Sequence, residues 1–189
     1  MKIVFRSFGF VVCFSWASVV AAQSPQISVG ADLMLPVGDL AESASFGVGP
    51  AIGFEYPSAP RSSVTLQFAY NFLTPKDDEG DLIKSWTFMP IQLGFKRYFM
   101  EEQKGLYGQL LLGMHNVVIE TNPQDLGPIL GTTEGTSEAE AYFSWGLNAG
   151  YQLAKFDLGV RYNSLTGKSS TGNRGYFGFR LAYLFNLGT

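Results

Sequence analysis

Few residues in this chain are suited to catalysis. His115 is the only histidine, and Asn116 and Val117 follow it, so no serine stands close behind it. A distant serine such as Ser144 could still complete a His–Ser pair, because catalytic groups are brought together by geometry rather than by sequence order. The pattern therefore offers one weak candidate for acid–base chemistry, and we expect His115 to be a polar residue near the rim of the fold.

The acidic residues do not predict a metal site. The run from Lys76 to Asp81 is rich in Asp and Glu. It lacks the alternating Asp spacing and the distal Glu of a calcium-binding hand. Glycine-rich tracts such as Gly172–Gly175 are not followed by a predicted helix, so they do not form a phosphate loop. We expect no metal and no cofactor.

The first residues have the pattern of a secretory signal peptide. Lys2 and Arg6 precede an apolar stretch that ends in small residues at Ala22. We expect residues 1–22 to be removed and residues 23–189 to form one domain of about 167 residues. The only cysteine, Cys13, leaves with the signal peptide, which excludes disulfides and thiolate sites. The remaining 11 basic and 16 acidic residues give a net charge of −5, which argues against a nucleic-acid partner.

The rest of the chain alternates between apolar and small or polar residues with a period of two, which predicts β-strands. Charged residues make up 15% of the sequence, against about 25% in ordinary soluble domains. No later apolar run is long enough for a membrane helix, but most of the alternating runs approach the ~9–11 residues of a tilted membrane strand. Eight such runs cover residues 27–36, 46–56, 63–72, 85–99, 106–118, 140–152, 156–163 and 176–185.

The connections between these runs alternate in length. We expect long ones at 37–45, 73–84, 119–139 and 164–175, and short ones at 57–62, 100–105 and 153–155. Short turns at one end and long loops at the other, with an even number of strands, are typical of bacterial outer-membrane barrels. The same count places both ends of the domain on the side of the short turns.

The less apolar face of the runs carries small residues and a few charges. Six charged residues share this face: Asp32, Glu55, Lys96, Asp157, Arg161 and Arg180. An eight-stranded barrel has an interior just wide enough for side chains to fill, and an arginine turned to lipid at the midplane costs roughly 2–4 kcal/mol. We therefore expect these charges inside, with Arg161 and Arg180 paired to Glu55, Asp157 or Asp32, because unpaired buried charge is costly. Mere solvation in a wet lumen is the alternative.

Aromatic residues gather at the ends of the runs, as in the interfacial girdles of membrane barrels. The predicted girdle consists of Tyr56, Trp86, Phe99, Trp145, Tyr151, Tyr162, Tyr183 and Phe185. Two features fit this pattern less well. Pro50 and Pro90 lie within strands, where they remove backbone donors. In the fourth run the apolar phase changes at Pro90, which predicts a bulge there.

Three segments resemble those of known outer-membrane barrels. Gly178–Phe185 resembles the C-terminal assembly signal of such barrels, although the terminal Phe of that signal is absent. Ile27–Asp39 and Pro90–Phe99 look like the first and fourth strands of the outer membrane protein beta-barrel domain family, which includes the small OmpA/OmpX-type barrels. The resemblance implies insertion by the barrel assembly machinery, and it implies no single activity.

The predicted fold is therefore all-β, an eight-stranded antiparallel up-and-down transmembrane β-barrel in the outer membrane of a Gram-negative cell envelope. The expected role is structural or in surface interaction, with outer-membrane lipid as one partner, an unidentified partner at the outer loops, and a packed, charged lumen. Porin-like passage of small solutes is a variant. One alternative is a soluble periplasmic lipocalin-like barrel that binds an apolar ligand, with the charges outside. Another is a lipid A acyl-modifying barrel enzyme, because some barrels of this size are such enzymes. The known deacylases carry a serine two residues after the histidine, which His115 lacks, so we predict no enzyme.

Overall fold

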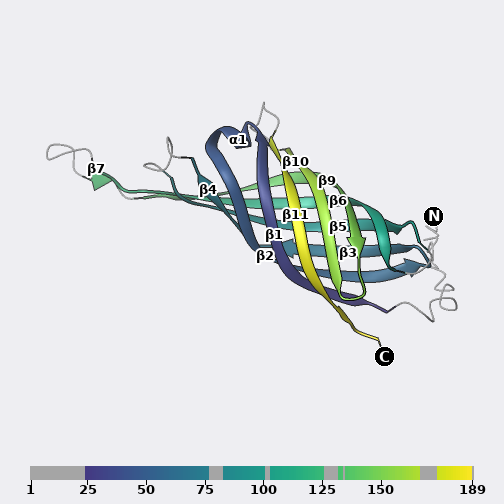
Figure 1. The fold of residues 1–189 in the computed structure, drawn as a ribbon. Helices are drawn as coiled ribbons and strands as arrows, with labels where there is room; N and C mark the ends of the chain where they lie inside the picture. Colours follow the sequence, from purple (N-terminus) through teal and green to yellow (C-terminus); the bar gives the residue numbers. More distant parts are fainter. Residues whose placement is uncertain are drawn as a thin grey trace, which may run out of the picture.

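The computed structural model describes residues 24–76, 83–100, 103–125, 132–133, 135–166 and 174–188. The predicted signal peptide and the acidic run after Lys76 lie outside these residues. Nine strands form one antiparallel sheet (Figure 1). They are β1 (Gln26–Gly38), β2 (Ala44–Ala59), β3 (Ser62–Ala69), β4 (Asn71–Pro75), β5 (Ile83–Tyr98), β6 (Gly105–Thr121), β9 (Ser137–Gln152), β10 (Phe156–Thr166) and β11 (Arg174–Asn186). Within the described part of the chain, no helix is long and apolar enough to cross a membrane.

The sheet closes on itself as a barrel of eight strands. β3 and β4 both pair with β2 on one side and β5 on the other, so they are two halves of one strand interrupted at Tyr70. β1 pairs with β2 and, from Gln26 opposite Asn186 to Gly38 opposite Arg174, with the last strand β11. Every strand is thus a neighbour of the strands before and after it in the chain. The predicted eight-stranded antiparallel barrel is confirmed.

The barrel has short connections at one end and mostly longer ones at the other. β2 and β3 are joined by two residues, β5 and β6 by six, and β9 and β10 by three. The connections at the opposite end are longer, except the first. That one was predicted to be long, but β1 and β2 run farther than expected and leave only residues 39–43, most of them in the one-turn helix α1 (Leu40–Ser43). Leu40 is buried, so this connection folds over the end of the barrel instead of extending away from it.

The predicted bulge at Pro90 is wrong. The register between β5 and β6 is continuous from Ser85 to Tyr98, and Pro90 lies opposite His115. The irregularity lies in the neighbouring strand, where the β3–β4 break at Tyr70 is flanked by Pro50 on β2 and Pro90 on β5. The Tyr70 N–H donates to the Pro50 carbonyl at 3.0 Å, whereas neither proline can donate a backbone hydrogen bond. The two missing donors therefore fall beside one interruption. The register shifts of these strands lie elsewhere, near strand ends, between Ala44 and Gly47, between Pro57 and Ala59, and between Ile83 and Ser85.

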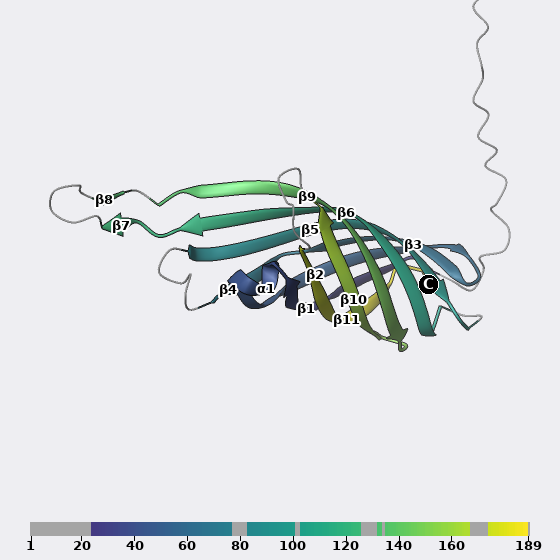
Figure 2. The same ribbon diagram turned by 90° about the horizontal axis from the view of Figure 1, so that it is seen from above.

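Three strands project beyond the barrel wall at the end opposite the termini. Figures 1 and 2 show β5, β6 and β9 continuing as a sheet, with the small pair β7 (Gln124–Asp125) and β8 (Thr132–Thr133) near its tip. The pairing of β9 with β10 ends at Phe143, while its pairing with β6 continues to Ser137. The parts of β5, β6 and β9 that lie beyond the β9–β10 pairing, which on β9 are residues 137–142, are called the projecting sheet.

Candidate functional site

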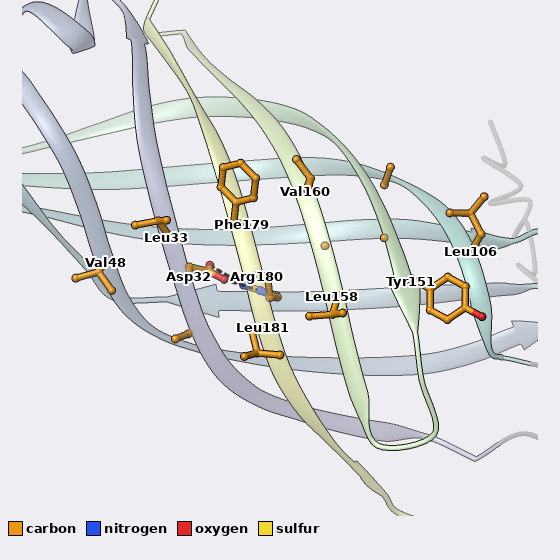
Figure 3. Close-up of a pocket in the computed structure, with 14 residues that line it drawn as sticks. Asp32, Leu33, Val48, Leu106, Tyr151, Leu158, Val160, Phe179, Arg180 and Leu181 are labelled. Carbon is orange, nitrogen blue, oxygen red and sulfur yellow. Dashed lines mark hydrogen bonds and ion pairs between the residues drawn. The ribbon is translucent and has the colours of Figure 1, made fainter.

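Side chains alternate between the two faces of the barrel wall. On β11, Phe179 and Leu181 are 41% and 54% exposed on the outside, while Arg180 between them is buried. Leu33 and Asp32 show the same contrast on β1. Figure 3 shows these apolar side chains standing outward, with Asp32 and Arg180 joined behind the wall. The outer surface is therefore apolar, and the lumen carries the charges.

One acidic side chain in the middle of the lumen holds two arginines. Asp32 faces Arg180 directly across the β1–β11 pair. The Arg180 Nε and Nη2 donate to Asp32 Oδ1 and Oδ2 at 2.7 and 2.9 Å, and the Arg161 Nη2 donates to Oδ2 at 2.5 Å. Arg161 lies opposite Gly178, and a Cβ there would come within 2.9 Å of the Arg161 Cγ. The glycine leaves the space through which Arg161 reaches the carboxylate.

A second charged cluster lies nearer the short turns. The Lys96 Nζ is 3.0 Å from Glu55 Oε2 and 3.4 Å from Asp157 Oδ2. Tyr98 donates to Glu55 at 2.6 Å, and Tyr107 donates to Asp157 at 2.7 Å. The Lys96 Nζ also lies 3.9 Å from the centre of the Tyr107 ring, within range of a cation–π interaction.

All six charged residues expected in the lumen are buried there, in these two clusters. Arg161 and Arg180 meet Asp32, whereas Glu55 and Asp157 meet Lys96. The three acids and three bases balance, so the lumen has no net charge from this set. Such balance matters because burying an unpaired charge costs several kcal/mol.

Neutral polar side chains that were not among the predicted site residues complete the network. Gln152 accepts from Lys96 at 2.8 Å, and Gln67 accepts from Arg161 at 3.2 Å. Gln103, in a short turn, donates to Glu55 at 3.1 Å and to Ser63 at 2.8 Å. Gln67 and Gln152 lie in strands, at positions that alternate in the same way as those of the charged residues. The period-two pattern could therefore have predicted that they face the lumen. Gln103 lies in a turn, where no periodic signal exists.

The lumen is filled at this level. The cavity beside Glu55, Lys96 and Asp157 measures about 20 Å³, room for about one water molecule. Toward the opposite end, the lumen becomes apolar. A cluster of buried side chains lines it: Met34, Leu40, Ala44, Leu73, Trp86, Phe88, Val117, Tyr142, Leu165 and Tyr176. The packed side chains favour a closed lumen over an open pore.

The aromatic residues expected in the girdle are mostly on the outer face. Tyr56, Phe99, Trp145, Tyr151 and Phe185 are exposed, and Tyr162 and Tyr183 are half-buried against other rings. Trp86 was wrongly placed in the girdle. It is only 8% exposed and belongs to the apolar cluster inside the barrel. Trp86, Gln92 and Lys96 occupy alternate positions of β5 and all point into the lumen. The same side of β5 therefore faces inward before and after Pro90, and only the polarity of that side changes.

His115 is not at the rim. It is fully buried in the lumen, and its Nε2 lies 2.8 Å from the Tyr176 hydroxyl. Ser144, the serine considered as its partner, accepts a hydrogen bond from Gln92 at 3.4 Å. The histidine therefore takes part in a buried tyrosine–histidine contact, and its described partner is not the serine.

An eight-stranded barrel that is apolar outside and charged inside belongs to the class of the small outer-membrane-type barrels. Solved structures of two proteins of this class are similar to the chain. Ail, the attachment invasion locus protein of Yersinia pestis, matches with a TM-score of 0.59 and 14% identity, over 86% of this chain and 99% of Ail. The N-terminal β-barrel domain of Pseudomonas aeruginosa OprF matches with a TM-score of 0.52 and 13% identity, over 84% and 97%. These similarities confirm the resemblance in fold.

The chain belongs to the family described as "Protein of unknown function (DUF3575)", whose model matches residues 44–172, from β2 to beyond β10. No curated protein matches the sequence. Ail is also known in complex with the heparin analogue sucrose octasulfate, and that structure matches with a TM-score of 0.58 and 17% identity, over 86% of this chain and 98% of Ail. At these identities the structural similarity concerns the fold alone.

Proposed function

We propose that this chain is an integral β-barrel protein of the bacterial outer membrane, with a sealed lumen and a role in surface interaction. The observation that carries the proposal is the inversion of polarity across the wall. Large apolar side chains face outward on every strand, while Asp32, Arg161 and Lys96 are buried. A protein in water rarely exposes a continuous apolar surface of this extent. A lipocalin-like barrel would need these charges outside, so the arrangement disfavours that alternative.

The route to the membrane is part of the same proposal. Residues 1–22 have the pattern of a signal peptide, which would deliver the chain through the inner membrane. Residues 178–185 resemble the signal that the barrel assembly machinery reads, and they form the end of β11, the strand that closes the sheet on β1. The short connections then lie on the periplasmic side, and the projecting sheet lies outside the cell.

The first test of this proposal is gel mobility. A closed membrane barrel stays folded in SDS until it is heated, so boiled and unboiled samples of the membrane fraction should give different bands. The protein should also resist extraction by alkaline carbonate. A protein found in the soluble periplasmic extract, with a band that heating does not move, would contradict the proposal.

The projecting sheet supports the surface-interaction role. The stretch of β9 from Ser137 to Ala141 is exposed and lies beyond the β9–β10 pairing. An exposed sheet edge is a template for the addition of another strand. Glu138 and Glu140 are exposed there, and Glu120 on β6 pairs at 3.6 Å with Lys84 on β5. Since the Glu120–Lys84 pair is neutral, the charges of Glu138 and Glu140 are the ones that favour a partner segment that is extended and basic.

The same charges predict a difference from Ail. Sucrose octasulfate is strongly anionic, so the glutamates of the projecting sheet should repel it. In calorimetric titrations of the purified barrel at low salt, we expect no saturable binding. Replacing both Glu138 and Glu140 by lysine should introduce weak, salt-sensitive binding. Saturable binding by the unchanged protein would show that the acidic sheet does not determine which ligands approach.

A further inference from the structure

The outer part of the lumen contains a cavity that is much larger than the one beside the Lys96 cluster. It measures about 190 Å³ and lies beside α1. Its lining is largely apolar and comes from five elements: Leu40, Trp86, Phe88, Val117, Tyr142 and Leu165. A closed apolar cavity of about 150 Å³ is large enough to bind benzene. The space is therefore sufficient for a compound with a single ring.

Trp86 lines this cavity and carries a hydrogen-bond donor, its Nε1–H, that has no partner among the described residues. The side chain is only 8% exposed. A buried donor without a partner costs free energy, and buried indole N–H groups usually find an acceptor. Six buried polar side-chain atoms of the described residues have no hydrogen-bond partner, and Trp86 Nε1 is the only one of them whose residue lines this cavity.

The edge of the cavity is polar. Arg174 and Asp39 contribute to the lining, and both are more exposed than the aromatic residues. The Arg174 Nη1 donates to the Tyr142 hydroxyl at 2.8 Å, and its guanidinium carbon lies 5.6 Å from the centre of the Tyr142 ring. An apolar interior, one buried donor and a polar edge together describe a site for a small ligand with an apolar body and an acceptor group.

We propose that this cavity binds a small single-ring compound that carries a carbonyl oxygen or a similar acceptor. The ring packs against Phe88, Val117 and Leu165. The Trp86 Nε1 lies beneath the surface of the cavity, and the indole turns when the compound binds so that its N–H donates to the acceptor. The binding site thus lies at the outer end of a barrel whose inner end is sealed by the Lys96 cluster. A compound that enters is held there and does not pass through.

Acetophenone and ethylbenzene provide a matched pair of probes, because they have similar shapes and only acetophenone carries an acceptor. Binding is measured by ligand-observed NMR with the full barrel in lipid nanodiscs, and empty nanodiscs correct for partition into lipid. We expect acetophenone to bind about five- to tenfold more tightly than ethylbenzene, as one hydrogen bond would give. Equal affinities would overturn the assignment of Trp86 as the donor.

Three variants distinguish binding in the cavity from binding at the lipid-facing surface of the barrel. Trp86→Phe removes the donor and keeps the aromatic lining, so it should abolish the preference for acetophenone. Val117→Phe should fill the cavity and abolish the binding of both compounds. Trp145→Phe changes the other tryptophan of residues 23–189, which lies on the outer face, and should change neither affinity. Heat-dependent mobility in SDS shows whether each variant still forms the barrel. Binding that survives Val117→Phe in a folded barrel would refute the site.

Discussion

Replacing Asp32 by asparagine is expected to lower the free energy of unfolding by about 3–5 kcal/mol, the cost of removing one partner from a buried ion pair. Arg161 and Arg180 both donate to Asp32 Oδ2, and all three side chains are buried. Asparagine keeps the shape of the side chain but removes the negative charge. Two guanidinium groups then remain together in the lumen without a carboxylate. Urea-induced unfolding followed by tryptophan fluorescence, in detergent or lipid vesicles, measures the change.

Two further variants test whether the lost negative charge is what destabilises the Asp32→Asn barrel. Asp39→Asn makes the same chemical change at an exposed position without a side-chain capping bond, and it should change stability by about 0.5 kcal/mol or less. The triple variant Asp32→Leu, Arg161→Met, Arg180→Met removes the whole charge set and should recover most of the loss, because well-packed apolar residues can replace buried ions. If Asp32→Asn is as stable as the parent, lumenal water solvates the arginines and the pairing contributes little.

An arginine in place of Leu181 is expected to destabilise the inserted barrel by roughly 2–4 kcal/mol, the cost of exposing this side chain to lipid at the bilayer midplane. Leu181 is 54% exposed on the outer face. It lies along β11 between the aromatic residues Phe177 and Tyr183. In a water-soluble barrel, the same substitution at an exposed position would have little effect on stability. Unfolding from lipid vesicles therefore distinguishes a lipid-facing wall from a water-facing one.

Leu187→Arg provides the matched control for depth. Leu187 is as exposed, at 55%, but it lies just beyond the end of β11. There the arginine can reach the headgroups, and the cost should fall to about 0–1 kcal/mol. Equal effects of Leu181→Arg and Leu187→Arg would contradict the proposed position of the membrane.

The strands and their faces could be predicted from the sequence because both depend on neighbouring residues. A period of two assigns every second side chain to one face, and the cost of exposing arginine to lipid decides which face is inside. This reasoning places Asp32, Glu55, Lys96, Asp157, Arg161 and Arg180 in the lumen, as the structure does. It also yields the strand count and, with the exception of the connection at α1, the alternation of short and long connections.

Trp86 shows where this reasoning fails. Near the outer end of the barrel the lumen is itself apolar, so inward residues such as Trp86 and Phe88 have the same character as those that face outward. The change of polarity along β5 then resembles a change of phase. Only the pairing of Trp86 with Leu73 and Ile119 in the neighbouring strands shows that the register continues unchanged.

The choice of ionic partners also depends on the tertiary structure. The local periodicity predicts that three acidic and three basic residues lie inside the barrel. Which of them pair depends on the order and register of strands that are far apart in the chain. Closure of β11 on β1 brings Arg180 opposite Asp32, and the gap at Gly178 admits Arg161. The apolar cavity arises in the same way, because its lining converges from α1, β5, β6, β9 and β10. The alternation of residues along each strand therefore determines the barrel and its two faces, whereas long-range closure determines the contacts inside it.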